Sequence, residues 1–237
     1  MQIDFFEEFP TKENLEKLKL IDWKCTVYLA SPSLKKFREI EKEVKKLNKK
    51  VSCGYWPVLR KSEGYWLSYY SKRKALLRII KELNRNKKRL VLLWDFEKPL
   101  FAPYLFITEL INKEKNKKLI SNFFKKARKH NIMIHLCEPS LRLKVSCDKR
   151  IVMAYSSLSL FPSFSLRKKI QQIKKLKNSS IALGCIAKGI LRVEPRIKPA
   201  KLKQDLSIVS KAGIKNAVIY RLGGLNKSYL TVIKKFL

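Results

Sequence analysis

Residues 89–96 read RLVLLWDF, a nearly unbroken apolar run that ends beside two acids, Asp95 and Glu97. A strand that is covered on both faces has such a sequence, whereas a half-exposed strand alternates apolar and polar residues. Residues 131–137, NIMIHLC, repeat the pattern, and a helix-period segment near 104–129 lies between the two runs. The pair predicts two parallel strands that are joined by a helical crossover.

Further apolar runs of strand length lie on both sides of this pair, and helix-period segments alternate with them along the chain. All but one of the eight strands are followed by a clear helix, and 131–137 is followed by a loop or at most a turn. The expected strands are 3–6, 25–30, 51–56, 89–96, 131–137, 151–156, 181–187 and 216–222. The expected helices are 11–20, 31–47, 71–84, 104–129, 165–177, 199–212 and a short one from about 227.

This alternation favours a (β/α)8 TIM barrel, with a doubly wound open sheet as the second choice. No linker rich in Gly, Ser or Pro divides the sequence, so we expect residues 1–237 to form a single domain. Two helix starts are predicted from their side chains: Thr11 suits the N-cap of the first helix, and Ser31 suits that of the second, with Pro32 in its first turn.

The composition restricts the classes of protein. The formal net charge is +35, and its lysines fall on the polar faces and ends of the expected helices, so we expect non-specific binding of polyanions rather than specific recognition. No apolar run reaches the roughly 18 residues of a membrane span, and no signal peptide is apparent, which predicts a soluble, cytoplasmic protein. The five cysteines form no CxxC motif and are expected to be reduced, and two histidines make a zinc site or a Ser-His-Asp triad improbable.

Active sites of (β/α)8 barrels lie at the carboxyl ends of the strands. Six of the nineteen acids are expected at that end of the barrel. Like charges brought together raise one another's pKa, so such a cluster needs a use or a cation. The acids are Glu7, Glu8, Asp95, Glu97, Glu138 and Glu194.

Asp95 and Glu97 form the most specific local signal. In an extended segment they point the same way, so that one carboxyl can hold a proton while the other stays charged, as general acid–base catalysis requires. The alternative is that the pair binds a cation or forms salt bridges with lysine. Trp94, which precedes the pair, and Arg221, at the end of the last strand, are further expected substrate-binding residues.

An aromatic stretch supplies the expected substrate-binding surface. Residues 53–71, CGYWPVLRKSEGYWLSYYS, carry Gly-Tyr-Trp twice. Aromatic faces stack on the C–H faces of sugar rings while their polar edges reach hydroxyl groups, so Tyr55, Trp56 and Trp66 are expected to contact a sugar, together with Glu7. The alternative is a small aromatic core beneath a long loop.

The end of the fourth strand resembles family 18 glycoside hydrolases, the chitinase-like barrels, whose motif at this place is DxxDxDxE. Asp95 and Glu97 match its last two acids, and Leu90 and Leu93 stand where the first two acids belong. At the sixth strand, residues 153–156 read Met-Ala-Tyr-Ser, which is similar to the Met-x-Tyr-Asp of that family with serine in place of the acid.

The resemblance covers these two short segments. It implies that Glu97 donates a proton and that Asp95 and Tyr155 stabilise a substrate acetamido group that acts as the nucleophile. A second arrangement needs no acetamido group: Glu97 protonates the leaving group and Glu194, after the seventh strand, attacks the sugar. Glu138 completes the expected catalytic set.

Two other classes of function stay open. One is a Mg²⁺-dependent phosphoryl or phosphodiester hydrolase, in which Arg221 and the Gly223-Gly224 turn would hold phosphate. The other is a barrel that binds a saccharide or a polyanion without turning it over. We expect an oligosaccharide or a small molecule as substrate, and neither a cofactor nor a bound metal.

Overall fold

The computed structural model describes residues 1–141, 143, 145–156, 162–192 and 194–237. Its strands follow one another in the order β1 to β8 in a closed parallel barrel, which confirms the (β/α)8 fold and excludes the open sheet. The strands are β1 Gln2–Glu7, β2 Cys25–Ser31, β3 Val51–Pro57, β4 Leu90–Asp95, β5 Ile132–Glu138, β6 Lys149–Met153, β7 Ser179–Gly184 and β8 Asn216–Tyr220.

Helices follow the strands as the periodicity predicts, and the expected helix near 104–129 is divided into two. The helices are α1 Lys12–Glu16, α2 Leu34–Leu47, α3 Arg73–Asn84, α4 Leu105–Thr108, α5 Lys113–Lys126, α6 Pro162–Lys174, α7 Pro199–Lys211 and α8 Lys227–Lys234. As expected, no described residue between β5 and β6 is helical.

One of the two predicted helix caps is confirmed. The Thr11 hydroxyl accepts a hydrogen bond from the Asn14 amide at the start of α1. The prediction for α2 is wrong, because Ser31 is the last residue of β2 and the Ser33 hydroxyl accepts the Lys36 amide instead. β2 ends one residue later than the predicted strand 25–30, at the position expected for the cap.

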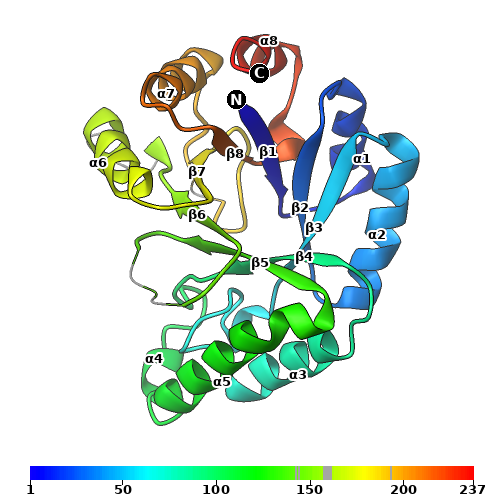
Figure 1. Ribbon diagram of the computed structural model, residues 1–237, viewed down its shortest axis with the longest axis vertical. Helices are drawn as coiled ribbons and strands as arrows, with labels where there is room; N and C mark the ends of the chain where they lie inside the picture. The colour runs from blue at the N-terminus through cyan, green and yellow to red at the C-terminus, as the bar shows by residue number, and fades with distance from the viewer. Residues whose placement is uncertain (142, 144, 157–161, 193) are drawn as a thin grey trace. The chain divides into compact units, whose positions relative to one another are not determined.

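The chain divides into two compact units. Unit 1 comprises residues 1–29, 40–53 and 151–237. Within it β1 pairs with both β2 and β8, and β7 pairs with β8, so that the carboxyl ends of these strands share one edge. Helices α7 and α8 pack beside each other near β8 (Figure 1).

Unit 2 comprises residues 30–39 and 54–150. Its central ladder joins β4 to β5, from Leu90 opposite Ile132 to Asp95 opposite Cys137. The helices α3 and α5 lie side by side in this unit (Figure 1), and the apolar side of α3 is buried. That the whole chain folds as one domain stays a prediction.

The burial of the strand residues agrees with the prediction from the sequence. Leu92, Leu93 and Trp94 of β4 are all fully buried, as expected of a strand covered on both faces. The five cysteines are free thiols, and all except Cys147 are buried. Among the described residues, no helix combines the length and the apolar character needed to cross a membrane.

Candidate active site

The carboxyl ends of β4 and β5 bring three acids together in unit 2. Asp95 ends β4 and is paired with Cys137 of β5, while Glu97 lies two residues further on and is partly exposed. Burial raises the pKa of the Cys137 thiol well above its usual value, and the charges of Asp95, Glu97 and Glu138 raise it further. The charges of these three of the six predicted acids therefore all affect one buried thiol, and a cluster of all six acids stays a prediction.

The direction of the Asp95 side chain follows from its neighbour. Trp94 is fully buried, and its ring packs 5.7 Å from Phe123 and 5.2 Å from Phe124, both on α5. Because successive side chains of a strand point to opposite faces, Asp95 points away from α5. Trp94, an expected substrate-binding residue, is therefore packed between β4 and α5.

Glu138 holds the loop that follows β5. Its carboxylate forms an ion pair with Arg150 and accepts the Leu143 amide at 3.4 Å. The Arg150 guanidinium also donates to the carbonyl oxygens of Leu143 at 2.7 Å and Val145 at 2.9 Å. Arg150 was not predicted from the sequence, and its contacts favour a positioning role for Glu138.

The paired Gly-Tyr-Trp stretch forms a packed aromatic layer. Tyr55 is fully buried, with its ring 5.1 Å from that of Phe37 on α2, and Trp56 is 3% exposed. Trp66 is 5% exposed and stacks on Phe101 at 5.6 Å. These three expected sugar-binding rings lie mostly beneath the surface, and sugar contact by them stays a prediction.

This aromatic layer fixes the loop after β3 against β4. The Lys61 ammonium lies 4.8 Å from the centre of the Phe101 ring, and the Leu67 amide donates to the Asp95 carbonyl oxygen at 3.0 Å. Gly64 adopts φ +116°, a conformation that favours glycine, and it lies against Ser71. The loop is thus hydrogen-bonded to Asp95, the first residue of the acid pair.

Tyr69 is the ring of this stretch that lies partly exposed beside the acids. Its ring packs 4.8 Å from that of Phe96, which stands between Asp95 and Glu97. Burial raises the pKa of its hydroxyl, and the charges of Glu114 and Glu138 raise it further. A half-buried ring of this kind can stack on a sugar, which the sequence alone did not distinguish from its neighbours.

In unit 1, Glu7 is fully buried at the end of β1 and accepts several hydrogen bonds. Its donors are the amides of Phe9 at 2.8 Å and Gly223 at 2.6 Å, the Asn14 side chain at 3.3 Å and the Arg221 guanidinium at 2.8 Å. Arg221 also donates to the Lys188 carbonyl oxygen at 2.9 Å. Glu7 and Arg221 were expected to bind substrate, and their contacts join the loops after β1, β7 and β8.

Burial raises the pKa of Glu7 to about 7, although Arg221 and the two amides lower it. A carboxyl with a raised native pKa binds protons more tightly in the folded chain than in the unfolded chain. The contribution of Glu7 to the free energy of unfolding is therefore expected to fall as the pH rises from about 4.5 to about 7.

Urea unfolding at about pH 5 and about pH 7 tests this expectation. In Glu7→Gln, the loss of stability between the two pH values should be smaller than in the wild type. Glu16→Gln, at an exposed salt bridge with Lys19, serves as the control and should keep the wild-type pH dependence. An unchanged pH dependence in Glu7→Gln would contradict the raised pKa.

A second acidic group of unit 1 surrounds Tyr220. The Tyr220 hydroxyl donates to Glu8, which also accepts the Ile190 amide at 2.8 Å, and Glu194 accepts the Gly189 amide at 3.3 Å. Burial raises the pKa of Tyr220, and the charges of Glu8 and Glu194 raise it further. Tyr220 was missed, because an apolar strand such as NAVIY gives no sign that its last ring meets two acids.

Tyr155 packs beside this group, with its ring 5.6 Å from that of Tyr220. Ser156, which stands where family 18 enzymes carry an acid, instead donates to Asp205 of α7 at 2.5 Å. Asp205 is fully buried and also accepts Lys201 at 2.6 Å. The serine thus joins the end of β6 to α7, and the expected catalytic roles of Tyr155 and Glu194 stay predictions.

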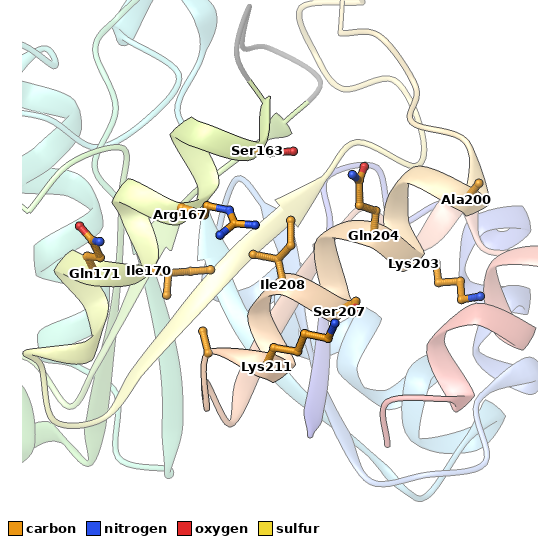
Figure 2. Close-up of a pocket in the computed structure, with 11 residues that line it drawn as sticks. Ser163, Arg167, Ile170, Gln171, Ala200, Lys203, Gln204, Ser207, Ile208 and Lys211 are labelled. Atoms are coloured by element: carbon orange, nitrogen blue, oxygen red, sulfur yellow. The ribbon is translucent and has the colours of Figure 1, made fainter.

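Cavities in unit 1 are lined by cations. One of about 700 Å³ lies between α6 and α7 (Figure 2), where Arg167, Lys203 and Lys211 reach it from the two helices. Another, of about 510 Å³, lies at the ends of β7 and β8 and is lined by Lys17, Arg196 and the Gly223-Gly224 turn, among others. Within the described ranges, no group of three or more His, Cys, Asp or Glu side chains is placed to hold a metal ion.

The (β/α)8 barrel of this chain is similar to solved structures that include a glycoside hydrolase domain and a spore cortex-lytic enzyme. The chain matches the PgaB (BpsB) glycoside hydrolase domain from Bordetella bronchiseptica with a TM-score of 0.61 and 12% identity, over 99% of this chain and 98% of that chain. It also matches the spore cortex-lytic enzyme SleL from Bacillus megaterium QM B1551 with a TM-score of 0.57 and 11% identity, over 100% of this chain and 74% of that chain.

At these identities the likeness establishes the fold alone. No protein-family model and no curated protein sequence matches the chain significantly. The resemblance to family 18 therefore stays an interpretation of the two short segments that carry it.

Proposed function

We propose that the protein is a glycoside hydrolase that acts on an oligosaccharide or a polysaccharide. Glu97 is its general acid and base, and Asp95 is the neighbouring carboxylate that stabilises positive charge as the glycosidic bond breaks. The observation that carries the proposal is the position of Asp95 and Glu138 at the carboxyl ends of the paired strands β4 and β5, with Glu97 two residues after Asp95. The likeness of the fold to the PgaB (BpsB) glycoside hydrolase domain supports the same class of reaction.

The surroundings of the acids suit this chemistry. Asp95 is 3% exposed and Glu97 is partly exposed, so the two carboxyls, two residues apart, occupy different environments. Different environments separate the pKa values of neighbouring acids, which lets one act as acid while the other stays ionised. Glu138 is paired with Arg150, and in this proposal it positions the loop rather than transfers protons.

Tyr69 is the proposed sugar-stacking ring. It is partly exposed, it contacts Phe96 between the two acids, and its hydroxyl can bond to a sugar hydroxyl at the edge of the ring. The buried ring of Trp66, stacked on Phe101, supports the loop that carries it.

A panel of neutral and amino-sugar polysaccharides tests the proposed reaction. The purified protein should release new reducing ends from at least one of them, with and without EDTA. Release that EDTA abolishes would show that the cleavage needs a metal ion and would contradict the metal-free roles of Glu97 and Asp95. Binding to a polysaccharide with no release of reducing ends, in the whole panel, would overturn the proposal in favour of a non-catalytic saccharide-binding barrel.

A further inference from the structure

The segment between β4 and α5, residues 98–112, carries an unusual set of exposed apolar side chains. Five of the large apolar residues that are exposed in the described part of the chain fall within it, and the others are scattered over α3, α6 and the C-terminus. The five are Leu100 at 53%, Tyr104 at 47%, Ile107 at 78%, Leu110 at 57% and Ile111 at 83% exposed. We call this set the apolar tip.

The apolar tip is held in place from its other side. Leu105 is fully buried, and Phe106 packs 4.9 Å from the ring of Tyr70. The Glu109 carboxylate accepts the Arg73 amide at 3.4 Å, and the Tyr104 hydroxyl donates to the Ser62 carbonyl oxygen at 2.9 Å. The exposure of the tip is therefore a feature of an anchored segment, with one side packed on unit 2 and the other in solvent.

The spacing of the exposed residues places them on a common face. Tyr104, Ile107 and Ile111 are three and four residues apart, and the chain at 104–112 is wound in α4 and the turns that follow it. Residues three and four apart lie on the same side of a helical segment. The tip thus presents several large side chains in one direction.

Cations flank the apolar tip along the chain. Lys98 precedes it, and the exposed Lys115, Lys117 and Lys118 follow it on α5, whereas the acids of the segment 98–118 are Glu109 and Glu114. Glu114 is itself 3.7 Å from Lys117. The net charge of the whole chain is +35. An exposed apolar tip flanked by lysines in a strongly basic chain combines the two attractions that hold peripheral proteins on anionic membranes.

We propose that the apolar tip is a peripheral anchor for an anionic lipid surface. Ile107 and Ile111 enter the boundary between headgroups and acyl chains, while the lysines bind the headgroups and lay their apolar stems along it. A second copy of the chain is a poor occupant, because two strongly basic surfaces repel. A nucleic acid would use the lysines but would leave the aliphatic side chains without a partner.

Flotation with lipid vesicles tests the proposal independently of any hydrolase activity. The wild-type chain should bind vesicles made of equal parts of phosphatidylcholine and phosphatidylglycerol, and should bind pure phosphatidylcholine vesicles much more weakly. The double variant Ile107→Ser/Ile111→Ser should lower the partition coefficient on the anionic vesicles by about tenfold or more. Both side chains are exposed, so the variant should keep the unfolding midpoint of the wild type.

Phe164→Ser is the matched control, because Phe164 is 70% exposed on α6, outside the apolar tip. It should bind anionic vesicles as the wild type does. Equal binding by the double variant, the control and the wild type would show attraction by charge alone and would overturn the proposal. So would an absence of wild-type binding, or a dimer in light scattering that the double variant abolishes.

Discussion

Glu97→Gln is expected to lower kcat by about 10² to 10⁴, on whichever polysaccharide the wild type cleaves. The amide has nearly the shape of the carboxyl, but it cannot deliver a proton to the leaving oxygen. KM should change much less than kcat, because proton transfer belongs to the transition state rather than to substrate binding.

Glu114→Gln is the matched control for this variant. Glu114 lies in the same unit, on the exposed side of α5, with 67% of its side chain exposed next to Lys117. Its substitution should leave kcat within about twofold of the wild type, since exposed salt bridges contribute little. Wild-type turnover by Glu97→Gln would remove Glu97 from the mechanism, whatever the substrate proves to be.

Arg150→Met is expected to lower the free energy of unfolding by about 3–5 kcal/mol. The Glu138 side chain is 1% exposed and that of Arg150 is 16% exposed, so methionine would leave a buried carboxylate without its ion-pair partner. The substitution also removes the donors to the Leu143 and Val145 carbonyl oxygens. Urea unfolding measures the loss.

Arg128→Met is the control for this measurement. Arg128 forms an ion pair with Asp148 at 2.6 Å, but 83% of its side chain is exposed, so the expected loss is about 0–1 kcal/mol. The double variant Glu138→Leu/Arg150→Met should recover part of the stability, because it removes the stranded charge as well as its partner. Equal losses in Arg150→Met and Arg128→Met would contradict a structural role for the buried pair.

The strands could be predicted because a parallel barrel buries both of their faces. RLVLLWDF reads as β4 for this reason, and the acids at its end follow from the location of sites in such barrels. The same burial hides the direction of each side chain. When both faces are apolar there is no alternation to read, so the sequence could not show that Trp94 faces α5 or that Tyr55 packs on Phe37.

Long-range polar pairs could not be predicted from the sequence, for a different reason. Glu138 and Arg150 are twelve residues apart across a loop, and a chain with 54 lysines and arginines offers too many candidate partners for any one acid. The positions of acids at the strand ends could be predicted, but the partners of each acid could not. In unit 1 they hold Arg221, Tyr220 and loop amides, and in unit 2 Asp95 and Glu97 lie beside Cys137.

The predictions from single residues and short spacings had different outcomes. The N-cap prediction for Thr11 was correct, because the Thr11 hydroxyl accepts a hydrogen bond from the amide three residues later. Ser31 failed because Ser33, two residues later, offers the same hydroxyl, and the extent of β2 decides between them. Residues 104–111 of the apolar tip were predicted to belong to one long helix, because apolar spacing does not distinguish a buried face from an exposed one.

The position of a bound oligosaccharide relative to Glu97 tests the central claim most directly. The measurement is a crystal structure of Glu97→Gln with an oligosaccharide that the wild type cleaves. The account predicts that the scissile glycosidic oxygen lies within about 2.6–3.2 Å of the side chain at position 97, with the sugar stacked on Tyr69. A sugar bound away from β4, or a scissile bond out of reach of both Asp95 and position 97, would contradict it.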